Sequence, residues 1–406
     1  MNKFIQNLFL ILFPFYPLWA WVCYSITKKN IDFVINILLI SFALYFLINS
    51  NRKLPKYLLF FIIFTIYHLC SIYINNLAPP QNTNWLYFIF SDTNLFACTI
   101  LIIVENTYFN NRFITTMNRN IFIIVLISLI VSLIQIKHPL FFLNEDMDEN
   151  SVFFEQGRIF SIYSWGNQNS GGITFPILIA VLLSIYYTKK LSLFLIFFSG
   201  IIVSFLFKGR YVMISTLVAL SQLFLSNIKL LSKRVQWILF LTSCIIFAGF
   251  VAEKAGYNIN EVIDNRILEK ESDMASAKAR ILSYEVFLKK FPENPWLGVG
   301  PETRDDVIKL LGGEAPGIHI GYLSYLYYYG IIGSLFLFLT LYYLLKEAWL
   351  VGREYNFWGS FFGLASFCLA NFTLVYFNLS EMGIIIAVIY LRHFSENPSV
   401  KYPDGL

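Results

Sequence analysis

The chain is a succession of long apolar stretches that short polar segments separate. A helix that spans a membrane needs about 20 mainly apolar residues, because the hydrocarbon core is about 30 Å thick. The stretches are continuously apolar and lack the two-residue alternation of a membrane strand, which favours helices. Twelve stretches meet or approach this length: 4–25, 31–50, 55–76, 86–104, 120–137, 171–188, 191–207, 211–228, 235–252, 319–345, 355–375 and 379–392. The sequence therefore predicts an all-α polytopic membrane protein with about 12 transmembrane helices, built as a single membrane domain over residues 1–406.

The composition excludes a soluble protein. Of the 406 residues, 57% are hydrophobic and only 14% are charged, whereas soluble globular proteins carry about 25% charged residues. The five cysteines lie in apolar stretches and share no metal-ligand spacing. The chain also lacks the glycine-rich loops that bind nucleotides and the His-Glu motif of zinc hydrolases. No metal, cofactor or nucleic acid is therefore expected.

The positions of Lys and Arg predict the orientation. Cytoplasmic loops of membrane proteins carry an excess of basic residues. If the N-terminus is inside, most Lys and Arg residues near the expected helices fall in the inner loops, and Lys28 and Lys29 are the clear exception. Both termini are therefore expected in the cytoplasm.

Two segments expected on the outer side are longer than turns. Residues 139–170 form the smaller one, and residues 253–318 form a large loop between expected helices nine and ten. Apolar residues recur at helical spacing between 281 and 291, so the large loop is expected to be partly helical. Loops on a rigid scaffold often carry function, which makes these segments the first place to look for a site.

Arginines in these outer segments are candidates for binding an anion. Arg158, Arg210 and Arg280 each lie close to glycines or aromatic residues, and the planar guanidinium matches phosphate oxygens. Arg210 also begins an expected helix, where a cation is mildly unfavourable unless an anion is bound. The alternative is that these side chains reach lipid head groups or nearby acids. Lys208 and Arg304 are further candidates, and a solvated surface also accounts for Arg304.

His319 is the candidate general base. It opens the expected tenth helix on the outer side, and a helix N-terminus favours the neutral imidazole that a base requires. The acids Glu285, Asp305 and Asp306 could orient such a base. An interfacial histidine that caps its own helix is the alternative.

Two ionisable residues fall inside expected helices. Asp92 lies near the start of the fourth, where an acid is costly unless it faces protein or water. His68 lies inside the third and is interpreted as a packed residue.

Four motifs in a fixed order resemble those of the O-antigen ligase/polymerase superfamily of bacterial inner-membrane proteins. An Arg precedes a Gly/Asn-rich helix start, a Gly-Arg turn follows, the large loop holds a longer pattern, and a His then opens the next helix. The residues that carry this order are Arg158 to Gly172, Lys208-Gly209-Arg210-Tyr211, Ala279-Arg280, Tyr284-Glu285, Phe291, Pro295, Gly298-Val299-Gly300, His319 and Tyr329-Gly330-Ile331-Ile332-Gly333. The family's usual His-Asn is His319-Ile320 in this chain.

The resemblance implies a metal-independent glycosyltransferase that uses an undecaprenyl-diphosphate-linked oligosaccharide at the periplasmic face of the bacterial inner membrane. The arginines would hold the pyrophosphate, and His319 would act as the base, with Glu285 as its assisting acid. Tyr322 and the tyrosines that follow it could pack on sugars or form an interfacial belt. A chain-length regulator or a flippase is an expected partner, besides the lipid bilayer.

Within this superfamily, a polymerase joins repeat units on the lipid carrier, and a ligase transfers the glycan to lipid A-core. The altered His motif and the aromatic-rich helices favour a polymerase of O-antigen type for lipopolysaccharide or other polysaccharide biosynthesis. The ligase is the alternative. A polysaccharide transporter or flippase is a more distant one, because the two halves of the chain do not match as repeats.

Overall fold

A computed structural model describes most of the chain as helices and short connections. The described residues are 2–19, 22, 32–49, 52–75, 89, 92–142, 159, 161–163, 168–186, 189–207, 210–225, 274–301, 305–312, 317–373, 375 and 377–396. Every regular element among them is a helix. The α-helices are α1 (Asn2–Leu12), α3 (Asp32–Asn49), α4 (Lys56–Ile74), α6 (Thr93–Asn106), α7 (Asn111–Lys137), α9 (Gln168–Ile185), α10 (Lys190–Leu206), α11 (Arg210–Leu225), α14 (Met274–Lys290), α15 (Asp305–Leu310), α16 (Gly321–Tyr355), α17 (Gly359–Ala370) and α18 (Met382–Glu396).

The all-helical prediction is confirmed for the described residues. Each expected span overlaps a helix, except 235–252, which lies outside them. The helices α4, α7 and α16 are long and apolar enough to cross a membrane by length and composition, and several shorter helices are apolar. The count of twelve spans and the side of the membrane on which the large loop lies remain predictions.

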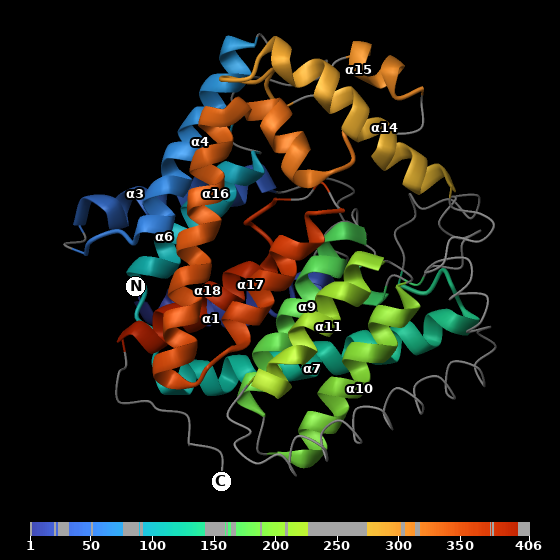
Figure 1. Cartoon of the computed structure of the whole chain (residues 1–406). Helices are drawn as coiled ribbons and strands as arrows, with labels where there is room; N and C mark the ends of the chain where they lie inside the picture. The colour runs from blue at the N-terminus through green and yellow to red at the C-terminus, as the bar shows by residue number, and fades with distance from the viewer. Residues whose placement is uncertain are drawn as a thin grey trace.

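Helix α9 lies at the centre of the bundle (Figure 1). It packs against α10, α11, α17 and α18, and all its residues from 171 to 183 are buried. Such a helix is apolar all round because it meets protein on every side. Glycines allow the close approach: a Cβ at Gly359 of α17 would lie 2.7 Å from the Cα of Val181. Small residues serve the same purpose where membrane helices pack tightly.

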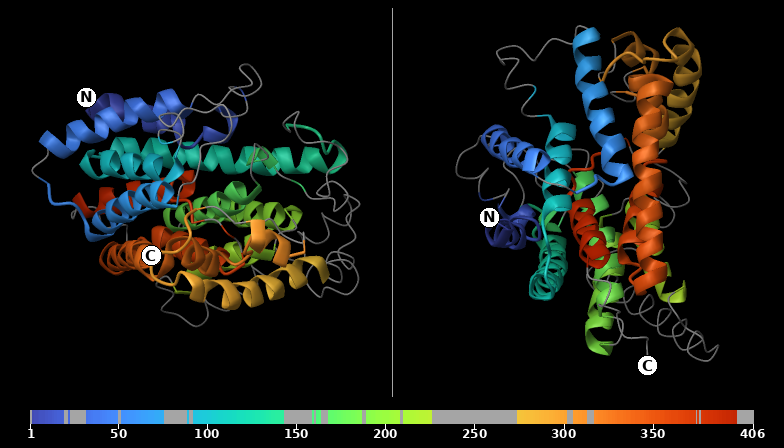
Figure 2. Two further views of the ribbon diagram at one scale, coloured as in Figure 1. Left: turned by 90° about the horizontal axis from the view of Figure 1, so that it is seen from above. Right: turned by 90° about the vertical axis from the view of Figure 1, so that its left-hand side faces the viewer.

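Helix α16 runs beside α4 and is broken near its first third (Figure 2). Gly330 has φ 61° and ψ −168°, a conformation outside the helical region. A break of this kind frees backbone N–H and C=O groups, and each unsatisfied group in hydrocarbon costs several kcal/mol.

The segment 295–300 satisfies these groups. Four backbone hydrogen bonds join it to residues 327–332: Val299 N to Tyr327 O (3.3 Å), Gly300 N to Tyr328 O (2.9 Å), Ile331 N to Pro295 O (2.8 Å) and Ile332 N to Trp296 O (3.2 Å). The Tyr67 hydroxyl of α4 also donates to the carbonyls of Leu297 (2.8 Å) and Tyr329 (3.1 Å). The Gly-Val-Gly motif and the Tyr-Gly-Ile-Ile-Gly motif therefore form one backbone clamp around the break.

Helices α14 and α15 form a small unit with its own apolar core beside the first part of α16. We call this the α14–α15 unit; its buried residues are Val286, Phe287, Val299, Val307, Leu311, Ile318 and Tyr327. Lys290 at the end of α14 pairs with Asp306 of α15 at 2.5 Å and with Glu293 at 3.1 Å. The expectation that this part of the chain is partly helical is confirmed for the described residues.

The clamp predicts an unusual sensitivity to alanine at two glycines. Gly330 and Gly298 both have positive φ, and a Cβ at either would overlap backbone atoms of the opposing segment. Gly312 also has positive φ (63°), but a Cβ added there would have no atom of the described residues within 4 Å. Gly312→Ala should therefore cost about 1–2 kcal/mol of conformational strain, and Gly330→Ala or Gly298→Ala several kcal/mol, because backbone overlap is added. Thermal unfolding of the purified variants in detergent measures the difference, and equal losses at Gly312 and Gly330 would contradict the clamp.

Candidate functional site

His319 is fixed to α14 through its backbone. It lies two residues before α16, which begins at Gly321 rather than at 319 as expected. Its N–H donates a hydrogen bond of 2.9 Å to Ser283 Oγ, and Ser283 is fully buried on the face of α14 that also holds Val286 and Phe287. The histidine therefore has a defined backbone position, and the residue as a whole keeps part of its surface exposed.

Arg280 lies one helical turn before Ser283 and acts on the same histidine. The protein packed around the His319 ring lowers its pKa below the ordinary value, and the positive charge of Arg280 lowers that pKa further. The ring is therefore neutral at neutral pH, which is the form that can accept a proton. The structure thus brings together two of the residues that the sequence singled out.

The structure gives the surroundings of two of the acids proposed to assist His319. Glu285 is exposed, and it lies two residues after Ser283, about 200° further round α14. Asp306 pairs with Lys290 at 2.5 Å, and this pairing holds the pKa of the Asp306 carboxyl below its usual range. Glu285 therefore lies on the side of α14 away from the face that holds Ser283, and Asp306 has another partner.

A second group of motif residues meets at the starts of α9 and α11. The N–H of Ile159 donates to the carbonyl of Leu206, at 3.2 Å. The ring of Tyr211 fills the space that a Cβ at Gly172 would need. The segment after Arg158, the end of α10 and the glycine-rich start of α9 are therefore neighbours.

Several predicted residues cannot be placed in this arrangement. Arg158, Lys208 and Arg304 lie outside the described residues, and Arg210 is described only as the first residue of α11.

Sequence reasoning missed a buried carboxylate beside the same helix start. Glu381 is only 6% exposed, and its Oε2 accepts a hydrogen bond of 3.1 Å from Thr174 Oγ1 in the second turn of α9. The signal was present, because an acid within the apolar stretch 379–392 is costly unless it faces protein or water. Its neighbour could not be read from the sequence, since Thr174 is 207 residues away.

His68 and Asp92 also form a site that the sequence revealed only in part. His68 Nε2 lies 2.7 Å from Asp92 Oδ2, and His68 Nδ1 lies 2.8 Å from the Tyr329 hydroxyl. The other Asp92 oxygen accepts from the N–H groups of Asn94 and Leu95, so Asp92 caps α6. Of the two surroundings that make an acid tolerable there, protein or water, the structure shows protein partners for Asp92. His68 is packed, as interpreted, with 4% of its surface exposed, and it also links α4, α6 and the break in α16 by hydrogen bonds.

The tyrosines at the start of α16 serve packing within the protein. The Tyr322 hydroxyl donates to the carbonyl of Cys368 at 2.9 Å, and its ring meets the ring of Phe377 edge-on, with centroids 4.8 Å apart. Tyr327 and Tyr329 are each 3% exposed. The interfacial belt is therefore wrong for Tyr327 and Tyr329, because their rings meet protein rather than lipid.

Within the described residues, no three His, Cys, Asp or Glu side chains converge as ligands of a metal ion would.

Comparison with known proteins bears on the segment that carries most of these features. Residues 195–338 match a family model described as O-antigen ligase. The match includes Arg210, Arg280, the glycine clamp and His319, and it leaves out Arg158 and Glu381. No curated protein matches the chain. Residues 195–338 are thus similar to the O-antigen ligase family, and the resemblance of this chain to the superfamily of O-antigen polymerases and ligases is confirmed.

Proposed function

We propose that the protein is a polymerase of lipid-linked oligosaccharide repeat units. In the proposed reaction, an acceptor sugar hydroxyl attacks the anomeric carbon of a glycan on undecaprenyl diphosphate. The bond from that carbon to the phosphate oxygen breaks, and the diphosphate leaves with the electron pair. The hydroxyl proton passes to His319. The donor already has a good leaving group, so the proposed reaction draws only on charge stabilisation and a base.

The pairing of Arg280 with His319 is the observation that carries this proposal. The guanidinium of Arg280 is close enough to lower the pKa of the His319 imidazole, and the bond from His319 N–H to Ser283 Oγ holds the backbone of His319 against α14. The arginine supplies positive charge for the departing diphosphate, and the imidazole supplies the base. One positive charge thus serves two purposes, since it also helps to keep the base unprotonated.

The remaining arginines are assigned to the diphosphate by the order of the motifs. Arg210 begins α11, and free N–H groups at a helix start favour an anion. Arg158 precedes Ile159, whose N–H bonds to the end of α10. We propose that Arg158 and Arg210 hold the diphosphate together with Arg280, at the periplasmic face of the bacterial inner membrane.

A ligase that transfers the glycan to lipid A-core is the second candidate. The description of the matching family, O-antigen ligase, favours it. The His319-Ile320 sequence, in place of the family's His-Asn, favours the polymerase. Both activities use the same donor and the same bond cleavage, so they differ only in the acceptor.

Substitution of His319 separates catalysis from a structural role. His319→Ala should leave the protein folded and able to bind the lipid-linked donor, but transfer should fall by about 10²–10⁴-fold, the usual contribution of a positioned base. His138→Ala is the matched control, because His138 is an exposed residue that follows the end of α7. Transfer is measured with purified protein and radiolabelled donor.

The same variant distinguishes the two acceptors in cells. On a gel of surface polysaccharide, loss of a polymerase removes the ladder and leaves core with a single repeat, whereas loss of a ligase removes that repeat too. A normal ladder from His319→Ala would exclude the histidine from the chemistry.

The reaction should depend on pH through His319, and Arg280 should set the position of this dependence. His319 acts as a base only when neutral, so the rate should fall as the pH drops through its pKa, which lies below the ordinary value. Arg280→Gln removes the neighbouring positive charge and makes protonation of the ring easier, so this pKa should rise. The acid limb of the residual rate profile should therefore move to higher pH. An unchanged acid limb, with only a lower rate, would limit Arg280 to binding the donor.

A further inference from the structure

A charged pocket lies at the ends of α4, α6 and α18, far along α4 from the His68–Asp92 pair. It has a volume of about 320 Å³ and is lined by Arg52, Lys53, Leu54, Pro55, Glu105, Asn106, Arg392 and Glu396. This volume is at the lower end of the range of ligand sites, about 300–1,000 Å³. The positive-inside pattern of the sequence predicts that this end of the bundle faces the cytoplasm, opposite the proposed glycan site.

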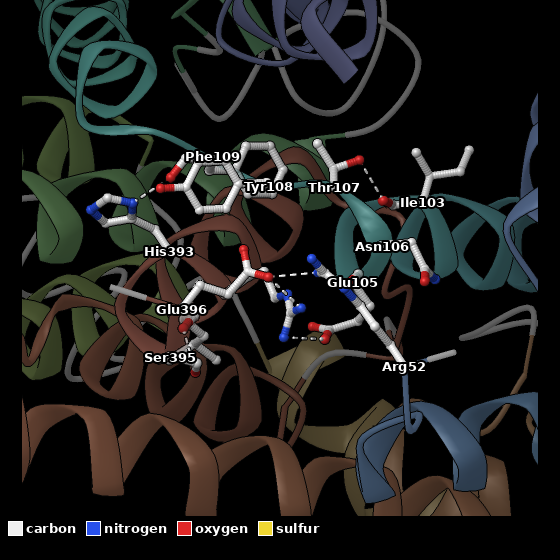
Figure 3. A network of polar contacts seen from close by, with 12 residues as sticks. Arg52, Ile103, Glu105, Asn106, Thr107, Tyr108, Phe109, His393, Ser395 and Glu396 are labelled. Carbon is white, nitrogen blue, oxygen red and sulfur yellow. Dashed lines mark hydrogen bonds and ion pairs between the residues drawn. The ribbon is translucent and has the colours of Figure 1, made fainter. Parts of the chain in front are cut away.

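The acids of the pocket are already paired. Glu396 Oε1 lies 2.6 Å from Arg52 Nη1 and 2.7 Å from Arg392 Nη2 (Figure 3). Glu105 accepts from the Tyr57 hydroxyl, and its other oxygen lies 3.7 Å from Arg392 Nη1. These contacts tie α4, α6 and α18 together and fix the guanidinium groups in the wall.

Donors are left over once these pairs are made. Lys53 is exposed and has no ion-pair partner in the described part of the chain. The Arg52 side chain also lines the pocket and is 44% exposed. Helix α4 begins at Lys56, directly after Pro55, without a side-chain cap, so its first N–H groups also face the connection that lines the pocket. Three cationic side chains and two carboxylates line the pocket, and Glu347 of α16, outside this lining, acts electrostatically on Glu105 and Arg392. The excess of positive charge in the lining, with a helix N-terminus beside it, favours an anion.

The residues around the pocket are of the kinds found at a membrane interface. Next to it, the Lys56 ammonium lies over the ring of Tyr343 of α16, 5.4 Å from the centroid. Tyr342 and Trp349 of the same helix are 55% and 43% exposed. Aromatic and basic side chains gather in this way where a helix leaves the hydrocarbon. A pocket at this level meets lipid head groups.

We propose that this pocket binds the phosphate of an anionic phospholipid of the cytoplasmic leaflet. The phosphate accepts hydrogen bonds from Arg52, Lys53 and the start of α4. Basic pockets between membrane helices on the cytoplasmic side bind lipid head groups in the same way. This lipid site rests on the packing of α4, α6 and α18. It does not require that the protein transfers glycans.

Thermal unfolding of the delipidated protein in detergent tests this site. Short-chain phosphatidylglycerol should raise Tm in a saturable way, because a ligand that binds only the folded state stabilises it. Phosphatidylcholine of the same chain length should have a much smaller effect. Equal shifts with both lipids would overturn the proposal. An equal shift with inorganic phosphate alone at the same concentration would overturn the lipid assignment and identify free phosphate as the ligand.

Lys53→Ala should weaken phosphatidylglycerol binding about fivefold, since one basic residue near an anionic lipid surface contributes about 1 kcal/mol. Its side chain is exposed, so the variant should fold. Lys190→Ala is the matched control, because Lys190 is an exposed lysine at the start of α10 and does not line the pocket. Equal binding by the Lys53→Ala variant and the wild type would overturn the site, as would an equal loss in both variants.

Discussion

The break in α16 at Gly330 is the constraint on which the arrangement of the candidate site depends. Exposed N–H and C=O groups are too costly in hydrocarbon to remain unpaired, so the break can exist only if another segment supplies their partners. Residues 295–300 do this with four backbone hydrogen bonds. The same segment follows α14 directly, so the bonds that repair α16 also set the position of α14 against it. His319 and Arg280 meet because both elements are held at this junction.

The helix α4 joins two polar networks that have different purposes. Towards its end, Tyr67 and His68 bond to the broken part of α16 and to Asp92. At its start, Tyr57 and the preceding Arg52 bond to acids of α6 and α18. Buried polar groups in a membrane protein must be satisfied by one another, so each network fixes the relative position of three helices. The first network supports the proposed catalytic junction, and the second shapes the proposed lipid site.

The residues of the candidate site that could be predicted are those that the sequence itself makes conspicuous, by their type and by their position in the chain. Arg280 and His319 stand out because a fixed charge and a titratable ring occur in a polar segment near an apolar stretch. Glu285 was selected by its neighbour in the motif, but helical geometry turns it away from Ser283. Glu381 and His68 were missed because their significance depends on partners, Thr174 and Tyr329, that are distant in sequence.

The sequence by itself determined that the protein is helical and built for a membrane, because continuous apolar stretches can satisfy their backbone groups only as helices. It also showed the order of the motifs, which a single chain carries regardless of how it folds. Only the tertiary structure decided that the Gly-Val-Gly segment and the Gly330 break form one clamp, and that the charged residues at the ends of α4, α6 and α18 line a pocket. The clamp and the pocket both consist of groups that are far apart in the sequence. Hydrophobic periodicity indicates which face of a helix is buried, but it does not indicate which other segment covers that face.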